Sequence, residues 1–187
     1  MRAVIVHESM YGNTRAIADA IGEGLRAAGD VRVVPVAEAG PGLLGQADLV
    51  VVGGPTHAHS MSRPATRTAA MEASRKAGSQ LRLDPAASGP GVRDWLGAMG
   101  QVDAACAAFD TRMAGPAVLT GRASKGIASL LQRHGLTALA SPESFLVTKA
   151  NELYPGQAER AREWGALLAQ RLLAEGSPAR VRRAEPA

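Results

Sequence analysis

Ser9 and Thr14 place two hydroxyl groups at the ends of a polar turn near the amino terminus. Between them, Gly12 lets the backbone come close to a ligand, and Asn13 or Thr14 could cap a following helix. The start of such a helix offers free N–H groups and about half a positive charge, which together form a seat for a phosphate group. The turn contains no lysine, so neutral donors would hold the phosphate. The same pattern is also typical of an ordinary capped turn between a strand and a helix.

The residues on either side of this turn predict a strand before it and a helix after it. Residues 4–6 are a β-branched apolar run, and Ile17, Ile21 and Leu25 recur at helical spacing. A loop after the first strand of an α/β sheet lies at the carboxyl edge, where such folds place their ligands. The sequence contains neither GxxxxGK[ST] nor GxGxxG, which argues against nucleoside triphosphates and dinucleotides.

Two later polar loops also follow predicted strands. Residues 53–57, with the sequence GGPTH, come after the apolar run 47–52. Residues 109–112, with the sequence FDTR, end the apolar run 103–109. In a parallel sheet these loops and the first turn meet at one edge.

The sequence ESMYGNT at residues 8–14, together with these two loops, resembles the flavodoxin family over most of residues 1–174. The resemblance implies a doubly wound α/β fold whose five-stranded parallel sheet has the order 2-1-3-4-5. It also implies one FMN-binding domain over residues 1–174, in which the first turn is the phosphate loop. No metal and no catalytic side chain is assigned. The residues expected to bind FMN are Ser9, Met10, Tyr11, Gly12, Asn13, Thr14, Pro55, Thr56, His57, Ala58, His59, Asp110, Thr111 and Arg112.

Strand and helix patterns alternate along the chain, which favours right-handed crossovers and a parallel sheet. Pro35 marks the second strand as an edge strand. The fifth strand is either interrupted at Pro142 or is a strand with an edge extension. Later strands are expected over residues 31–36, 47–52, 103–109, and 136–140 with 144–147, and later helices over residues 65–76, 92–99, 123–134 and 156–174.

The sequence departs from the family pattern in two ways. Flavodoxins usually stack the flavin ring between Trp and Tyr side chains, and neither later loop contains one, although His57 or His59 could stack instead. Loss of an aromatic stack removes roughly 0.5–1.5 kcal/mol, so we expect weaker FMN binding. Arg63 and Arg112 add positive charge near the loops, which predicts a higher reduction potential than in acidic flavodoxins. Arg112 could equally form an ion pair with Asp110 or with another acidic residue at the surface.

The resemblance favours a one-electron carrier between redox proteins. The alternative is an FMN-dependent oxidoreductase that resembles quinone reductases or protoporphyrinogen dehydrogenases and acts on a small quinone-like substrate. Residues 62–100 could then supply the pocket walls. A signalling receiver domain would need an acidic residue where residues 53–55 read Gly-Gly-Pro, and is disfavoured. A domain that has lost its ligand is a further alternative.

Composition sets the remaining limits. The chain has 187 residues, of which 46% are apolar and 20% charged, as in globular proteins. The net charge of +4 is too scattered to favour nucleic-acid binding, and no apolar run is long enough for membrane insertion. We expect a cytoplasmic protein in which the single cysteine, Cys106, is buried and inert. Residues 175–187 are expected to form a basic, disordered tail.

Overall fold

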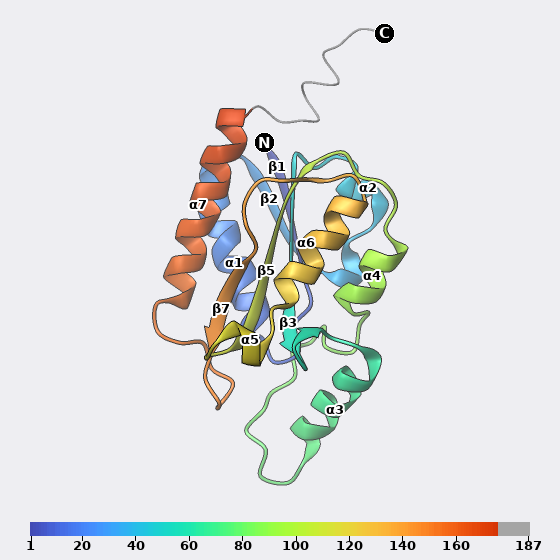
Figure 1. Cartoon of the computed structure of the whole chain (residues 1–187), viewed down its shortest axis with the longest axis vertical. Coiled ribbons are helices and arrows are strands. Elements are labelled where there is room, and N and C mark those ends of the chain that lie inside the picture. The colour runs from blue at the N-terminus through green and yellow to red at the C-terminus, as the bar shows by residue number, and fades with distance from the viewer. Residues whose placement is uncertain (176–187) are drawn as a thin grey trace, which may run out of the picture.

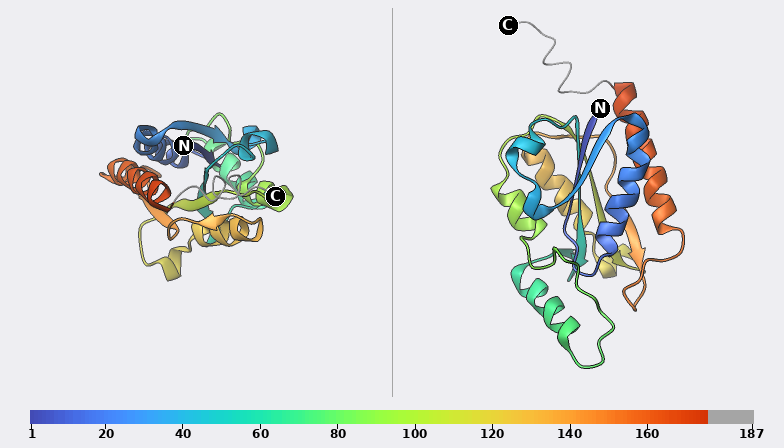
Figure 2. Two further views of the ribbon diagram at one scale, coloured as in Figure 1. Left: turned by 90° about the horizontal axis from the view of Figure 1, so that it is seen from above. Right: turned by 180° about the vertical axis from the view of Figure 1, so that it is seen from behind.

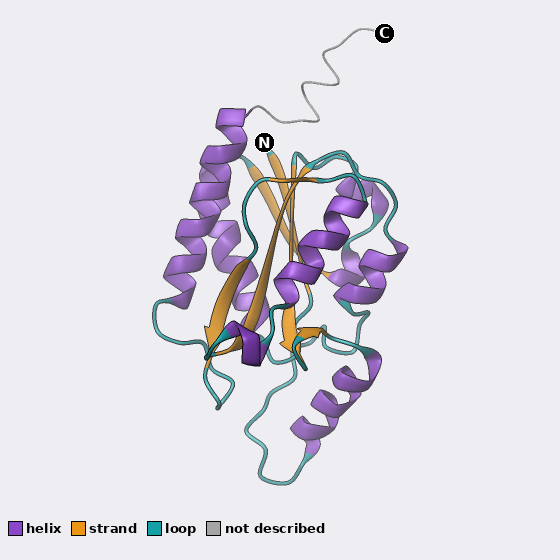
Figure 3. Ribbon diagram, in the orientation of Figure 1, coloured by secondary structure: helices purple, strands orange, loops and turns teal. Residues whose placement is uncertain are grey.

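A twisted parallel sheet runs through the centre of the computed structural model, between two layers of helices (Figures 1 and 3). Its strand order is β2-β1-β3-β5-β6, with β7 also paired to β5 and β4 paired to β3. The strands are β1 (Arg2–His7), β2 (Asp30–Pro35), β3 (Leu49–His57), β4 (Ser60–Met61), β5 (Ala105–Met113), β6 (Thr137–Ala138) and β7 (Glu143–Val147). The structure describes residues 1–175, so the predicted disordered tail lies outside the described residues apart from Glu175.

The sheet confirms the predicted doubly wound α/β class and differs from the predicted strand order in detail. The predicted fifth strand is present in two pieces, since β6 and β7 both pair in parallel with β5. The break falls where Pro142 has no N–H group to donate to the ladder. As predicted from Pro35, β2 lies at an edge of the sheet. The antiparallel strand β4 was not predicted.

Helices cover both faces of the sheet (Figure 2). α1 and α7 lie side by side on one face, whereas α4 and α6 lie on the other with the one-turn helix α2. α3 projects beyond the carboxyl edge, and α5 is a single turn at the same edge. The helices are α1 (Asn13–Leu25), α2 (Pro41–Leu44), α3 (Pro64–Arg75), α4 (Val92–Ala98), α5 (Ala117–Thr120), α6 (Ala123–Arg133) and α7 (Gln157–Glu175), with short 3-10 turns η1 (Arg26–Ala28) and η2 (Val36–Glu38).

The core has two halves because side chains of a strand alternate between the faces of the sheet. In β1, Ala3 and Ile5 pack in the cluster that contains α1 and α7, while Val4 and Val6 pack in the cluster that contains α4 and α6. All four are buried. β1 therefore reads as a continuous apolar run, as expected for a strand covered on both sides.

α1, which begins at the phosphate loop, is held in place by α7. The two helices meet at glycines: a Cβ on Gly165 would lie 2.3 Å from the Ile21 carbonyl oxygen, and one on Gly24 would lie 2.0 Å from the Arg162 carbonyl oxygen. Arg162 also forms an ion pair with Glu23 at 2.7 Å. This close contact fixes the direction from which α1 approaches the sheet edge.

Within residues 1–175, no helix is both long and apolar enough to cross a membrane. The same residues contain no group of three or more His, Cys, Asp or Glu side chains suited to hold a metal ion.

Candidate functional site

A cleft of about 110 Å³ lies at the carboxyl edge of the sheet, where β1, β3 and β5 end. Four segments border it: the phosphate loop, the end of β3, the end of β5 and the loop that follows β7. The cleft is lined by Met10, Tyr11, Asn13, Thr14, Pro55, Thr56, His57, Thr111, Arg112, Met113, Val147 and Asn151.

The phosphate loop is a tight turn that leaves its backbone donors free. The Gly12 N–H donates to the Ser9 hydroxyl oxygen at 3.0 Å, and Gly12 has φ +91°, a conformation that favours glycine. Among the described residues, the backbone N–H groups of Asn13, Thr14 and Arg15 have no hydrogen-bond acceptor. A Cβ added at Gly12 would meet no atom within 4 Å. The start of α1 therefore has free N–H groups, and the space beside Gly12 is open.

Two hydrogen bonds fix this loop to the rest of the cleft. The buried hydroxyl groups of Thr14 and Thr111 lie 2.7 Å apart and join the loop to β5. The Asn13 side-chain amide donates to the Asn151 carbonyl oxygen at 2.9 Å. Asn151 has φ +61° and lies in the loop after β7. Sequence reasoning missed this fourth segment, because nothing in its local pattern indicates that it lies beside Asn13.

The end of β3 forms a hairpin with β4. The two turn residues, Ala58 and His59, both have positive φ, 45° and 71°, which is the geometry of a tight hairpin turn. They lie outside the cleft lining, and both are exposed. His57 does line the cleft, with its Nδ1 3.4 Å from the Thr66 hydroxyl. Burial lowers the pKa of His57, Glu8 opposes that shift and Arg67 adds to it.

Two predicted site residues use their side chains to cap α6. The Asp110 carboxylate is fully buried and accepts a hydrogen bond from the Ser124 N–H at 2.7 Å. The Thr56 hydroxyl accepts one from the Ala123 N–H at 2.9 Å. These bonds satisfy donors at the start of α6. The second carboxylate oxygen of Asp110, Oδ1, is buried and has no hydrogen-bond partner within the described residues.

Arg112 folds back onto its own loop. Its guanidinium donates to the Met113 and Gly115 carbonyl oxygens at 3.2 and 2.9 Å, and to the Thr120 hydroxyl at 2.8 Å. Within the described residues, Arg112 and Asp110 do not form the ion pair that the sequence suggested. The positive charge of Arg112 is thereby fixed at the rim of the cleft.

The structure thus brings most of the predicted residues together. Met10, Tyr11, Asn13, Thr14, Pro55, Thr56, His57, Thr111 and Arg112 line the cleft; Ser9 and Gly12 shape the turn below it; Ala58, His59 and Asp110 lie outside the lining. Met113, Val147 and Asn151 line the cleft without having been predicted.

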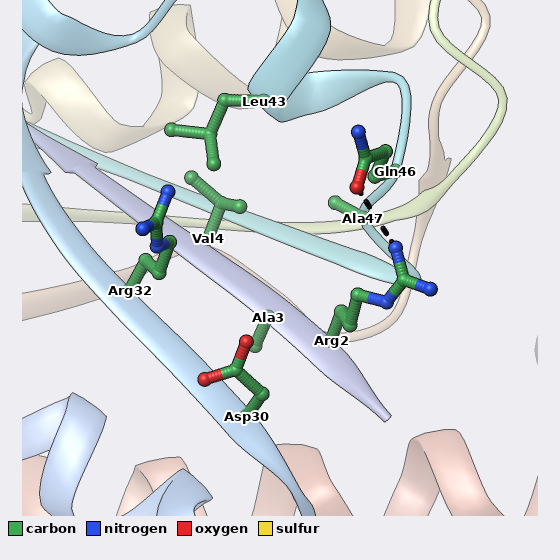
Figure 4. Close-up of a pocket in the computed structure, with 8 residues that line it drawn as sticks. All are labelled: Arg2, Ala3, Val4, Asp30, Arg32, Leu43, Gln46 and Ala47. Atoms are coloured by element: carbon green, nitrogen blue, oxygen red, sulfur yellow. Dashed lines mark hydrogen bonds between the residues drawn. The ribbon is translucent and has the colours of Figure 1, made fainter.

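A second cavity, of about 310 Å³, lies at the amino end of β1 and β2 (Figure 4). Leu43 of the short helix α2 borders this cavity. The Arg2 guanidinium donates to the Gln46 side-chain oxygen at 2.9 Å, and Asp30 and Arg32 also border the cavity. It shares no lining residue with the cleft at the carboxyl edge.

The sequence matches the flavodoxin family over residues 5–164, and the chain therefore belongs to that family. Its fold is similar to a flavodoxin from the domain Archaea, with 21% identity and a TM-score of 0.63, covering 92% of this chain and 99% of that one. Flavodoxin 1 from Bacillus cereus gives 17% identity and a TM-score of 0.61, covering 91% and 98%. A WrbA-like flavodoxin from Agrobacterium tumefaciens has 21% identity and a TM-score of 0.61, covering 94% of this chain and 99% of that one. A comparison with curated proteins gave no match.

FMN is the cofactor of the flavodoxin family and therefore of this chain. The residues present fit its phosphate end. The N–H groups of Asn13, Thr14 and Arg15 at the start of α1 are free, the space beside Gly12 is open, and the Thr14–Thr111 hydroxyl pair adds a further polar group. The cleft lining has one aromatic ring besides His57, that of Tyr11.

Proposed function

We propose that this chain is an FMN-dependent electron carrier that passes single electrons between redox proteins, with residues 1–174 as the FMN-binding domain. The observation that supports this function is the exposure of the apolar rim beside the cleft. Val118, Leu119 and Met113 have exposed fractions of 87%, 67% and 49%. A loop that enclosed a small substrate would bury such side chains, whereas a protein partner covers them on docking.

In this proposal, the backbone N–H groups at the start of α1 bind the phosphate of FMN. Asn13 and Thr14 orient the loop through Asn151 and Thr111. FMN, when bound, supplies one-electron and two-electron transfer, and the protein sets its orientation and the charge around it. The fixed guanidinium of Arg112 favours added negative charge beside the cleft, which supports a higher reduction potential than in acidic flavodoxins.

His57 favours a second candidate function, that of an FMN-dependent oxidoreductase of the quinone reductase or protoporphyrinogen dehydrogenase type. Its Nδ1 faces the Thr66 hydroxyl, so Nε2 is the ring atom left to hold or release a proton. Its lowered pKa keeps the ring neutral near pH 7. A small substrate of this second type that releases a proton on oxidation could pass that proton to such a neutral ring.

Reduction of the FMN-loaded protein distinguishes the two functions. A carrier is expected to take up electrons in two separate one-electron steps and to show little NAD(P)H-dependent quinone turnover by itself. A single two-electron step with rapid quinone turnover would overturn the carrier assignment. In that case His57→Gln is expected to slow turnover while leaving FMN bound.

A further inference from the structure

The segment of residues 62–92, which contains α3, follows the hairpin β3–β4 and runs past the phosphate loop to α4 (Figure 1). We propose that this segment positions the phosphate loop through the buried pair Glu8–Arg67, and so sets the affinity of the chain for the phosphate group of FMN. The inference rests on the proposed FMN site and assigns to Glu8 and Arg67 a positioning role without contact to the cofactor.

Glu8 is the connection between the segment and the loop. It directly precedes Ser9, and only 3% of its surface is exposed. One carboxylate oxygen accepts hydrogen bonds from Arg67 Nη1 at 2.7 Å and from the Ser62 hydroxyl at 2.5 Å. The other accepts one from the Val92 N–H at 2.8 Å, at the start of α4. Both oxygens are therefore satisfied by groups at the two ends of the segment and by one side chain of α3.

Arg67 is the buried anchor of α3. It is 7% exposed, and it is the only residue of that helix classed as buried. Besides Glu8, its guanidinium donates to the carbonyl oxygens of Ala87, at 2.9 Å, and Gly89. One side chain thus joins the helix, the returning part of the segment and the residue that begins the phosphate loop.

Further contacts hold the loop from the same side. The Tyr11 hydroxyl donates to the Ala70 carbonyl oxygen at 2.7 Å, and the Asp84 N–H donates to the Met10 carbonyl oxygen at 2.9 Å. The Asp84 carboxylate also forms an ion pair with Arg15 at 3.2 Å. The segment therefore binds the loop before, within and after the turn.

These contacts leave the N–H groups of Asn13, Thr14 and Arg15 free, so the loop is fixed without use of its phosphate donors. A phosphate site made of neutral donors binds more tightly when its donors are already in place, because less free energy is then lost in ordering the loop on binding. Arg67 also offsets the negative charge of Glu8, which in a buried setting would otherwise oppose a phosphate dianion.

Riboflavin, which lacks the phosphate of FMN, makes the test specific. We would measure the Kd values of the apoprotein and its variants for both flavins by quenching of flavin fluorescence. Arg67→Met is expected to weaken FMN binding by about tenfold, equivalent to about 1.4 kcal/mol, while riboflavin binding stays within about twofold. An equal loss for both flavins, or no loss for either, would overturn the positioning role.

Three further variants separate positioning from folding. Leu136→Ala removes a buried side chain at the opposite end of the sheet, and is expected to lower stability while it preserves the ratio of the two Kd values. Tyr11→Phe removes one hydrogen bond to the segment without creating a buried charge. It is expected to lower FMN affinity a few-fold, and an unchanged ratio of the Kd values for FMN and riboflavin would count against the proposal. Glu8→Gln combined with Arg67→Met removes both charges of the pair. If this double variant bound FMN as tightly as the wild type, the loss in Arg67→Met would be due to the unpaired charge of Glu8, and the positioning role would be wrong.

Hydrogen exchange gives an independent readout, because coupling between two sites is reciprocal. Amides of residues 62–92 are expected to exchange more slowly with FMN bound than with riboflavin bound. Equal exchange with the two flavins would contradict the proposed coupling. If the wild type bound FMN and riboflavin equally well, the phosphate seat itself would be wrong; if it preferred FMN and Arg67→Met kept that preference, only the role of the segment would be wrong.

Discussion

Gly12→Ala is a sharp perturbation of the proposed phosphate seat. Gly12 has φ +91°, and an added Cβ would meet no protein atom within 4 Å. The cost to folding is therefore confined to the backbone, about 1–2 kcal/mol for a left-handed non-glycine residue. For a chain of this size, each kcal/mol corresponds to a fall in Tm of roughly 2–4 °C.

The effect of Gly12→Ala on FMN binding should be larger than its effect on folding. The methyl group would project into the open space beside Gly12, at the start of α1, where the proposed site places the phosphate. Loss of one charge-assisted hydrogen bond costs about 1.5–3 kcal/mol, which corresponds to roughly 10-fold to 150-fold in Kd. Fluorescence titration with FMN measures the change in Kd, and thermal unfolding of the apoprotein measures the change in stability.

Gly156→Ala is the matched control for this variant. Gly156 has φ +80°, its added Cβ would also meet no atom within 4 Å, and it precedes α7 rather than α1. It should lower Tm by a similar amount and leave the Kd for FMN unchanged. If the two variants bound FMN with the same affinity, the phosphate of FMN would not lie over Gly12, and the site would have to be placed elsewhere.

Three further predictions concern the scaffold. Gly165→Ala places a Cβ 2.3 Å from the Ile21 carbonyl oxygen and should destabilise the protein by about 1–3 kcal/mol or more in urea unfolding; an unchanged midpoint would show that α1 and α7 pack less closely. Burial lowers the pKa values of His7 and His57, so as the pH falls below about 6.5 these histidines take up protons in the unfolded chain before they do so in the folded one. The free energy of unfolding should therefore fall as the pH drops from 7 to 5, and a rise would contradict these shifts. Burial raises the pKa of the Cys106 thiol to about 11, so native protein should react with a thiol reagent at pH 8 far more slowly than unfolded protein, and equal rates would refute its burial.

The parts of the site that could be predicted are those determined by local sequence. The strand, turn and helix around Gly12 follow from an apolar run, a polar turn and helical spacing, all within residues 2–25. The ends of β3 and β5 could be placed beside this turn because parallel strands in this fold share one carboxyl edge. The edge position of β2 followed from Pro35, which cannot donate to a ladder.

The partners of individual side chains could not be predicted in the same way. Thr56 and Asp110 lie in the predicted loops, yet their side chains cap α6, since sequence spacing does not show which helix start a loop will face. The Asn13–Asn151 bond joins residues far apart in the chain. The helix predicted over residues 65–76 is present as α3, but its attachment through the single buried side chain of Arg67 carries no local signal.

The most direct test of the account is an NMR titration of the isotopically labelled protein with FMN and, separately, with riboflavin. If the start of α1 binds the phosphate of FMN, the backbone amide signals of Asn13, Thr14 and Arg15 will shift strongly with FMN and only slightly with riboflavin. If those three amides respond equally to both flavins, or to neither, the phosphate of FMN is bound elsewhere and the central claim fails.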